Sequence, residues 1–552
     1  MVLDFPYKDC VLEGGQTKED QKRKEIFYNE TLASSEIIRM LDPKVFTKAK
    51  RYTKDGVEEN IKFDEKDNLI IKGNNLIALS SLLKRYEGKV KCIYIDPPYN
   101  TGSDSFNYND NFSRSTWLTF MENRLKLAKK LLKNDRVILV SIDEKQQAYL
   151  KVLMDEIFGN ENILEVFHLQ VRYTNKSLNE KDDFQPVMEY VLAYALDKKS
   201  FKPNKPFAPY DIKGFTNEIK ELSKGETLEI EGRKVTIFKK GEWKRIVHKE
   251  AKLELLKPTW ITGSIYSGTG HGTVYQKVVE PRYDVDGYGS LYKVYGLGED
   301  GLGYRYMRNP NSNAYTKGEM FSGVPMTTLE EIKKGTAKKY SPIVNYYDYS
   351  PDFGNIRHEG GVSFNSGKKP EKMLKMLFDF STNEGDLILD YHIGSGSSCA
   401  VAHKMGRQYI GIEQMDYIQE KAVKRLESII DGDKTGISKA VNWKGGGSFV
   451  YCELMENAKD LIREIENSDE NTIEDAKAKI YRDERIVPYI TRGELEKVDE
   501  YFKKLDLYDK KKALIKLIDK NKLYVNFSDI ENKDFDISDA DKVFTKSFYE
   551  VN

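Results

Sequence analysis

Short apolar runs alternate along much of the chain with stretches in which apolar residues recur every three or four positions. The runs have the length of buried strands, and the recurring positions mark one face of a helix. The predicted strands cover residues 69–72, 90–95, 137–142, 187–195, 387–390 and 409–412. The predicted helices cover residues 77–83, 115–132, 146–158, 370–380 and 397–405. Such alternation is typical of an α/β domain whose parallel sheet is covered by helices on both faces.

The alternation is interrupted once and is absent from both ends of the chain. Residues 197–355 are rich in Lys, Gly and Tyr with short β-branched runs, which indicates an inserted β-rich domain. Both ends are highly charged and have a helical spacing. We therefore predict an N-terminal helical arm (1–60), an α/β domain in two parts (61–200 and 356–430) split by the insertion (201–355), and a C-terminal helical domain for assembly (431–552).

Composition excludes several classes of protein but does not indicate a binding partner. The 552 residues carry 88 Lys and Arg against 88 Asp and Glu, so the net charge of +0 gives no general argument for nucleic acid. The four cysteines lack the spacing of a zinc site or a disulfide framework, and no apolar run is long enough to span a bilayer. No secretory signal is visible. We expect a cytoplasmic protein with no membrane association and no bound metal.

One predicted strand ends abruptly in Asp96, Pro97, Pro98 and Tyr99. Each proline fixes its own φ and restricts the residue before it, so this loop holds a carboxylate and an aromatic ring in fixed positions at the rim of the sheet. By itself, the loop is better explained as a turn in which an aspartate precedes proline. Its chemical meaning depends on what lies beside it.

A second strand ends in Asp390 and leads through a turn with Gly394 and Gly396 into a helix. Glycines let a ligand approach the backbone, and the helix N-terminus supplies free N–H groups. Glu413 ends the next strand, where dinucleotide-binding folds place the acid that holds ribose hydroxyls. Alone, such a glycine-rich turn is more often just a tight turn, and a nicotinamide site is a competing explanation.

Together the two motifs resemble the amino-methylating DNA methyltransferases of the permuted, β-class arrangement. Further segments are similar to the modification subunit of type III restriction-modification systems, and they span nearly the whole chain. These segments are residues 4–15, 96–110, 292–306, 352–359, 366–370 and 523–549. The resemblance implies a Rossmann-like S-adenosylmethionine-dependent methyltransferase domain, split by a target-recognition domain at 201–355.

The resemblance also implies a role for each motif. Asp96 and the carbonyl of Pro97 accept the amino protons of a flipped adenine, Pro98 stiffens the loop, and Tyr99 stacks on the base. The implied ligands of S-adenosylmethionine are Asn74, Lys369, Pro370, Asp390, His392, Gly394, Gly396 and Glu413. Asn74 stands where relatives carry an acid, and His392 stands where a phenylalanine is usual. A metal site at His392 or at His358 is disfavoured because no second His or Cys is nearby.

The insertion is the predicted DNA-reading part. A basic cluster around Trp243, which includes Arg245, is suited to phosphates, and Arg282, Arg305 and Arg308 are candidates for reading base edges. The predicted DNA-binding residues are Lys239, Lys240, Lys244, Arg245, Arg282, Arg305 and Arg308. A solvated surface explains the lysine cluster about equally well.

We expect methyl transfer to the N6 amino group of adenine in double-stranded DNA. The first alternative is methylation of the N4 amino group of cytosine, which requires the same hydrogen-bond acceptors. The second alternative is a DNA-recognition subunit without catalysis. A nicotinamide-dependent enzyme would explain the glycine turn but not the Asp96 loop. The expected partners are a second copy of the chain and a restriction (helicase-nuclease) subunit.

Overall fold

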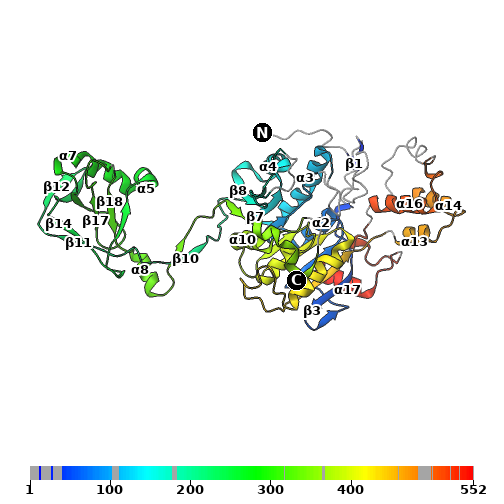
Figure 1. The fold of residues 1–552 in the computed structure, drawn as a ribbon. Helices are drawn as coiled ribbons and strands as arrows, with labels where there is room; N and C mark the ends of the chain where they lie inside the picture. Colours follow the sequence, from blue (N-terminus) through cyan, green and yellow to red (C-terminus); the bar gives the residue numbers. More distant parts are fainter. Residues whose placement is uncertain are drawn as a thin grey trace. The chain divides into compact units, whose positions relative to one another are not determined.

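The computed structural model describes most of the chain, in two compact units (Figure 1). The described residues are 11–13, 26–28, 40–101, 111–176, 183–315, 317–363, 367–457, 459–482, 499, 501–521, 524–533 and 535–550. One unit comprises residues 1–204 and 344–552, and the other comprises residues 205–343. The second unit lies inside the range predicted for the insertion, and each unit is described by itself.

An eleven-stranded mixed sheet forms the centre of the first unit. Its strands, in spatial order, are β20 (Tyr346–Asp348), β8 (Ile163–Gln170), β9 (Met188–Ala195), β7 (Leu132–Ile142), β6 (Val90–Ile95), β21 (Leu387–Asp390), β22 (Gln408–Glu413), β5 (Leu69–Lys72), β23 (Phe449–Leu454), β3 (Phe46–Thr53) and β4 (Gly56–Glu58). All pairs from β7 to β23 are parallel. The predicted split is confirmed, because β21 from beyond the insertion pairs with β6 from before it.

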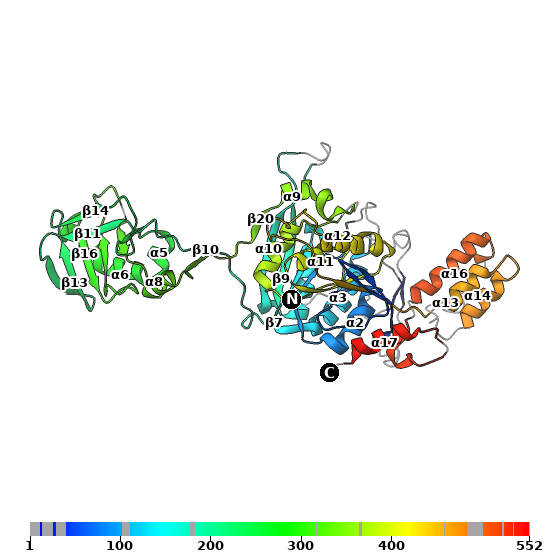
Figure 2. The ribbon, with the colours of Figure 1, turned by 90° about the horizontal axis from the view of Figure 1, so that it is seen from below.

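Helices cover both faces of this sheet (Figure 2). The helices α2 (Asn75–Tyr86), α3 (Arg114–Leu131) and α4 (Glu144–Phe158) pack on one face, where Trp117 and Leu125 are fully buried with Ile93. The helices α10 (Glu371–Ser381), α11 (Ser397–Lys404) and α12 (Lys424–Ile430) cover the other face. There the ring of Phe378 meets Tyr94 edge-on, with centroids 6.2 Å apart. The doubly covered α/β fold agrees with the prediction from the alternating pattern.

The edges of the sheet differ from the prediction. Strand β9 runs antiparallel to β7 and β8, and β3 runs antiparallel to β23 and β4. The helical prediction for the two ends is therefore wrong at residues 46–53, 56–58 and 449–454, which are strands. The reason is cross-strand packing, in which Tyr52 of β3 stacks on Phe449 of β23 with centroids 4.8 Å apart. Most of the rest of the predicted N-terminal arm lies outside the described residues, apart from the paired strands β1 (Val11–Glu13) and β2 (Ile26–Tyr28).

The C-terminal part contains two groups of helices. Helices α13 (Lys459–Asn467), α14 (Ile473–Arg482) and α16 (Leu507–Asn521) enclose a small core that includes Leu461, Ile465 and Phe502. Helix α17 (Asp539–Tyr549) instead joins the core of the large sheet, through Phe544 and Phe548. No helix in the described part of the chain is long and apolar enough to cross a membrane.

The second unit is rich in strands, as predicted. Its six-stranded sheet is antiparallel throughout, and two shorter strand pairs accompany it. The order of the sheet is β12 (Glu226–Ile230), β13 (Arg233–Phe238), β16 (Leu291–Tyr295), β17 (Tyr304–Arg308), β18 (Glu319–Ser322) and β15 (Lys257–Trp260). Its core includes Val235, Tyr292, Val294 and Met307, which are all fully buried.

Candidate active site

The two motifs meet at the carboxyl edge of the large sheet. Strands β6 and β21 are parallel neighbours, with Cys92 opposite Ile388 and Ile93 opposite Leu389. Asp96 follows the first strand and Asp390 ends the second, so both carboxylates lie at one edge. An open pocket at this edge is lined by Asp96, Pro98, Lys369, Asp390, Gly394 and Glu413 among others. Ligands of open α/β sheets bind at such an edge.

The Asp96 loop is held by contacts from three directions. The indole N–H of Trp117 donates to the carbonyl of Pro98 at 2.7 Å. The ammonium of Lys369 donates to Oδ2 of Asp96 at 2.9 Å, and the phenol of Tyr99 donates to Oε2 of Glu189 at 3.1 Å. Oδ1 of Asp96 is buried and has no hydrogen-bond partner among the described residues. One oxygen of this pocket-lining carboxylate is therefore without a hydrogen-bond partner in the described part of the chain.

Burial and charge act in opposite directions on Asp96. Burial raises the pKa of Asp96 above its usual range, and the ammonium of Lys369 opposes that rise. Burial also works to lower the pKa of Lys369, but the carboxylates of Asp96 and Glu189 outweigh it and hold that pKa above its usual value. Lys369 is therefore a cation at neutral pH, and it favours the charged form of Asp96.

The second half of the pocket is built around Asp390 and Glu413. Asp390 accepts from the backbone N–H of His392 at 2.9 Å and from the hydroxyl of Ser398 at 2.5 Å. Burial raises the pKa of Asp390 to about 7. Glu413 accepts from the backbone N–H of Gly394 at 3.0 Å and from two further backbone N–H groups beyond its own strand. Both acids are therefore fixed in position and lie within the pocket lining.

The turn between them needs its glycines. Gly394 and Gly396 have φ values of 49° and 76°, in the left-handed region that favours glycine. A Cβ at Gly396 would lie 3.1 Å from Cα of Ala422. Pro370 stands immediately before α10 as its N-cap residue. The two glycines allow a sharp turn before α11, and the first residues of α11 line the pocket.

The predicted ligands Asn74 and His392 have distinct environments. Asn74 caps α2, accepting from the backbone N–H groups of Leu76 and Ile77, and it is not among the residues that line the pocket. The next residue, Asn75, lines the pocket and donates to the carbonyl of Tyr391 at 3.2 Å. Burial lowers the pKa of His392 to about 3, so its ring is neutral. The described residues contain no cluster of His, Cys, Asp and Glu that could hold a metal ion.

Comparison with known proteins identifies the family of the chain. A family model described as "DNA methylase" matches residues 90–424. The chain is 34% identical to the probable type III restriction-modification enzyme HindVI Mod subunit of Haemophilus influenzae, over 100% of this chain and 85% of that protein. The chain belongs to this family. It is a DNA methyltransferase of the type III restriction-modification class, which confirms the predicted family.

More distant relatives share the same description. The EcoPI Mod subunit of Escherichia phage P1 is 27% identical over 80% of this chain and 68% of its own length. The EcoP15I Mod subunit of Escherichia coli is 26% identical over 77% of this chain and 70% of its own length. Among solved structures, the M1.HpyAVI–SAM complex aligns with a TM-score of 0.30 and 11% identity over 65% of this chain and 98% of that chain.

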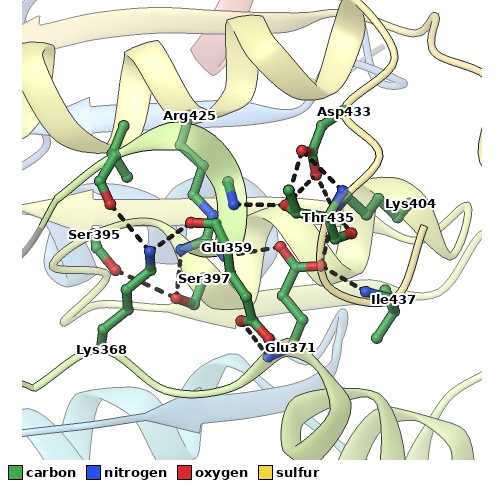
Figure 3. A network of polar contacts seen from close by, with 12 residues as sticks. Glu359, Lys368, Glu371, Ser395, Ser397, Lys404, Arg425, Asp433, Thr435 and Ile437 are labelled. Carbon is green, nitrogen blue, oxygen red and sulfur yellow. Dashed lines mark hydrogen bonds and ion pairs between the residues drawn. The ribbon is translucent and has the colours of Figure 1, made fainter. Parts of the chain in front are cut away.

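A buried polar network of this DNA methyltransferase lies beside the turn between Asp390 and α11, which we call the cofactor turn after its predicted role (Figure 3). The guanidinium of Arg425 donates to the hydroxyl of Ser397 at 2.6 Å and to Glu371 at 2.8 Å. Lys404 donates to Glu371 at 2.8 Å and to Asp433 at 2.6 Å. Sequence reasoning missed these residues. The available signal was the position of these charged residues on the sheet-facing sides of α10, α11 and α12. Without contacts, the sequence does not distinguish such buried charges from charges on a solvated helix face.

In the second unit, the predicted DNA-binding lysines are exposed, whereas the predicted DNA-binding arginines form ion pairs. Lys239, Lys240 and Lys244 are exposed. The four arginines are already engaged with carboxylates of their own unit. Their partners are Glu319 for Arg245 and Arg308, Asp286 for Arg282, and Asp300 for Arg305.

Proposed function

We propose that this DNA methyltransferase transfers the methyl group of S-adenosylmethionine to the N6 amino group of adenine. The observation that carries the proposal is Oδ1 of Asp96, a buried and unpartnered acceptor in the same pocket as the cofactor turn. An exocyclic amino group brings donors that such an oxygen needs, because an unsatisfied buried acceptor is costly. The target base must leave the duplex to reach it.

The residues of the pocket fit the cofactor. S-adenosylmethionine carries a cationic methionine end and ribose hydroxyls, which are donors, and the pocket offers the carboxylates of Asp390 and Glu413. Glu413 lies at the end of β22, where its Oε2 accepts from the N–H of Gly394. When bound there, S-adenosylmethionine supplies an electrophilic methyl group. The glycines of the turn let it approach the backbone.

The Asp96 loop then performs three tasks. Oδ1 of Asp96 and the carbonyl of Pro97 accept the amino protons of the base and stabilise the positive charge that grows on its nitrogen. The raised pKa of Asp96 suits that oxygen to take up the proton which the methylated nitrogen loses. Pro97 and Pro98 keep the loop rigid, and Tyr99 stacks on the base.

The remaining parts of the proposal concern partners. We propose double-stranded DNA as the substrate, with the exposed Lys239, Lys240 and Lys244 on phosphates. Base reading by Arg282, Arg305 or Arg308 stays a prediction, and it would require each side chain to leave its carboxylate. A second copy of the chain and a restriction subunit are the proposed protein partners.

The direct test is methyl transfer from labelled S-adenosylmethionine to genomic DNA, followed by nucleoside analysis. N6-methyladenine is expected. Detection of N4-methylcytosine instead would show that cytosine is the target base. Asp96→Ala should abolish transfer while calorimetry shows S-adenosylmethionine still bound, because Asp96 acts on the base. Full activity in that variant would remove Asp96 from the mechanism. If the wild-type chain transferred no methyl group to either base, a DNA-recognition subunit without catalysis would be favoured.

A further inference from the structure

The ammonium of Lys369 lies between two carboxylates. Its Nζ is 2.9 Å from Oδ2 of Asp96 and 3.5 Å from Oε2 of Glu189. The same oxygen of Glu189 accepts from the phenol of Tyr99, whose ring centroid lies 4.8 Å from the ammonium. The side chains of Lys369, Asp96 and Glu189 are only 6%, 15% and 17% exposed. The sequence did not single out Glu189.

These residues reach the site from three parts of the chain. Asp96 follows β6, and Glu189 is the second residue of β9. Because β9 runs antiparallel to β7, with Tyr190 opposite Ile142, β9 begins at the edge where β6 and β7 end. Lys369 comes from the segment that precedes α10, beyond the insertion. The cluster therefore forms only when both parts of the split domain are assembled.

We propose that Lys369 and Glu189 are positioning residues for methyl transfer. Lys369 takes Oδ2 of Asp96, which keeps the carboxylate charged and leaves Oδ1 to the target amino group. Glu189 holds Lys369 and Tyr99 in their places. This assignment rests on the proposed function, and it differs from the cofactor contact that family resemblance implies for Lys369.

The physical reason is the cost of a charge in a dry site. Asp96 must be ionised to stabilise the positive charge that grows on the amino group and to take up its proton, yet its surroundings penalise the charge. The charged and titratable groups that face it come from every neighbouring element. They are Lys369, Glu189, Tyr99, Tyr94 and Asp390. Lys369 is the cation of that group, so the ionisation of Asp96 depends on it.

Lys369→Met tests the charge. Single-turnover methyl transfer is measured against pH at saturating S-adenosylmethionine, so that titration of Asp390 in the cofactor turn does not limit the rate. The acid limb of the profile should move up by about one pH unit or more, because Asp96 then protonates more easily. Lys369→Arg keeps the charge and should keep the limb near its wild-type position. Lys372→Met, on the exposed face of α10 with a 64% exposed side chain, is the matched control.

Glu189→Gln tests the second carboxylate and should move the limb the other way. Loss of a negative charge near Asp96 favours the carboxylate, so the limb should move down while the rate on the plateau falls about tenfold, because Lys369 is held by one partner only. The amide oxygen of Gln still accepts from Tyr99. Glu189→Ala removes that contact as well and should be slower than Glu189→Gln.

The outcomes separate the inference from the function on which it rests. Opposite shifts of the acid limb, with Kd for S-adenosylmethionine within about twofold of wild type in calorimetry, support the inference. An unmoved limb, or shifts in one direction for both variants, would overturn it. A weaker Kd in Lys369→Met with an unmoved limb would make Lys369 a cofactor ligand instead. If the wild-type chain transferred no methyl group to adenine, the proposed function would fail whatever the variants did.

Discussion

Burial shifts the pKa of three residues at this site. Asp390 is satisfied by two donors, yet burial still raises its pKa to about 7. His392 lies two residues further along the turn, and burial lowers its pKa to about 3. Asp96 shows the same effect even with an ammonium beside it. Asp390 is therefore the group of the turn whose charge changes with pH near neutrality, whereas the ring of His392 stays neutral there.

The neutral ring of His392 predicts a pH-dependent stability. The ordinary pKa of histidine is 6.5 and the folded value is about 3, so below pH 6.5 the unfolded chain binds a proton that the folded chain refuses. The free energy of unfolding should fall by up to about 2 kcal/mol between pH 6.5 and pH 5 from this group. In His392→Phe that part of the loss should vanish. Urea unfolding of both proteins at pH 7.5 and pH 5 measures the difference, and equal losses would contradict the prediction.

Gly396 predicts a cofactor defect from a single methyl group. Gly396→Ala places a Cβ 3.1 Å from Cα of Ala422 at a φ of 76°, so the turn must shift. We expect Kd for S-adenosylmethionine to rise about tenfold or more in calorimetry. Gly385→Ala is the matched control, because Gly385 has a φ of 81° and nothing lies within 4 Å of its Cβ position. Equal losses of affinity in both variants would point to general backbone strain.

At the scale of elements, the buried network joins three helices to the cofactor turn. Glu371 begins α10, Lys404 ends α11 and Arg425 lies in α12, and all three side chains are fully buried. Among them, Arg425 donates to Ser397, the first residue of α11, directly after the turn (Figure 3). A buried charge is tolerated when it is paired, and removal of one partner leaves the other uncompensated.

Arg425→Met therefore predicts a loss of stability with a loss of cofactor affinity. The free energy of unfolding should fall by about 3–5 kcal/mol in urea, since Glu371 loses one of its two cationic partners. Lys375→Met is the control: it breaks the 2.6 Å pair with Asp379 on the outer side of α10, where a loss below about 1 kcal/mol is expected. A loss of that small size in Arg425→Met would show that the network does not hold the turn.

Elements that follow simple periodicity were predictable, and those fixed by tertiary contacts were not. The strands that carry Asp96 and Asp390 lie where the apolar runs predicted them. Strand β3 has the sequence Phe-Thr-Lys-Ala-Lys-Arg-Tyr-Thr, whose charged residues do not form the apolar pattern of a strand. It is a strand because it pairs with β23, which the sequence does not reveal. Glu189 was missed for a similar reason, because its role arises only from the reversal of β9. Sequence motifs identify the acids of the site, but only the assembled sheet shows their partners.

At the scale of the whole molecule, the two units have separate cores. The first is closed by α17, at the C-terminal end of the described chain, where Phe548 packs on Phe46 of β3 with ring centroids 4.8 Å apart. Arg85 of α2 donates to the carbonyl of Phe548 at 2.8 Å. The second unit has its own buried cluster, which includes Met307. Chain segments with separate cores can unfold as separate units.

This separation predicts that core substitutions act on one unit at a time. Phe548→Ala should destabilise the first unit by about 3–5 kcal/mol, and Met307→Ala should destabilise the second by about 2–5 kcal/mol. In calorimetric melting of the full chain, each variant should lower one transition and leave the other in place. S-adenosylmethionine should raise the transition that Phe548→Ala lowers, because the proposed cofactor pocket belongs to that unit and ligands stabilise the unit that binds them. If both variants lowered one shared transition, the cores would unfold together, and the insertion would be an integral part of the catalytic domain.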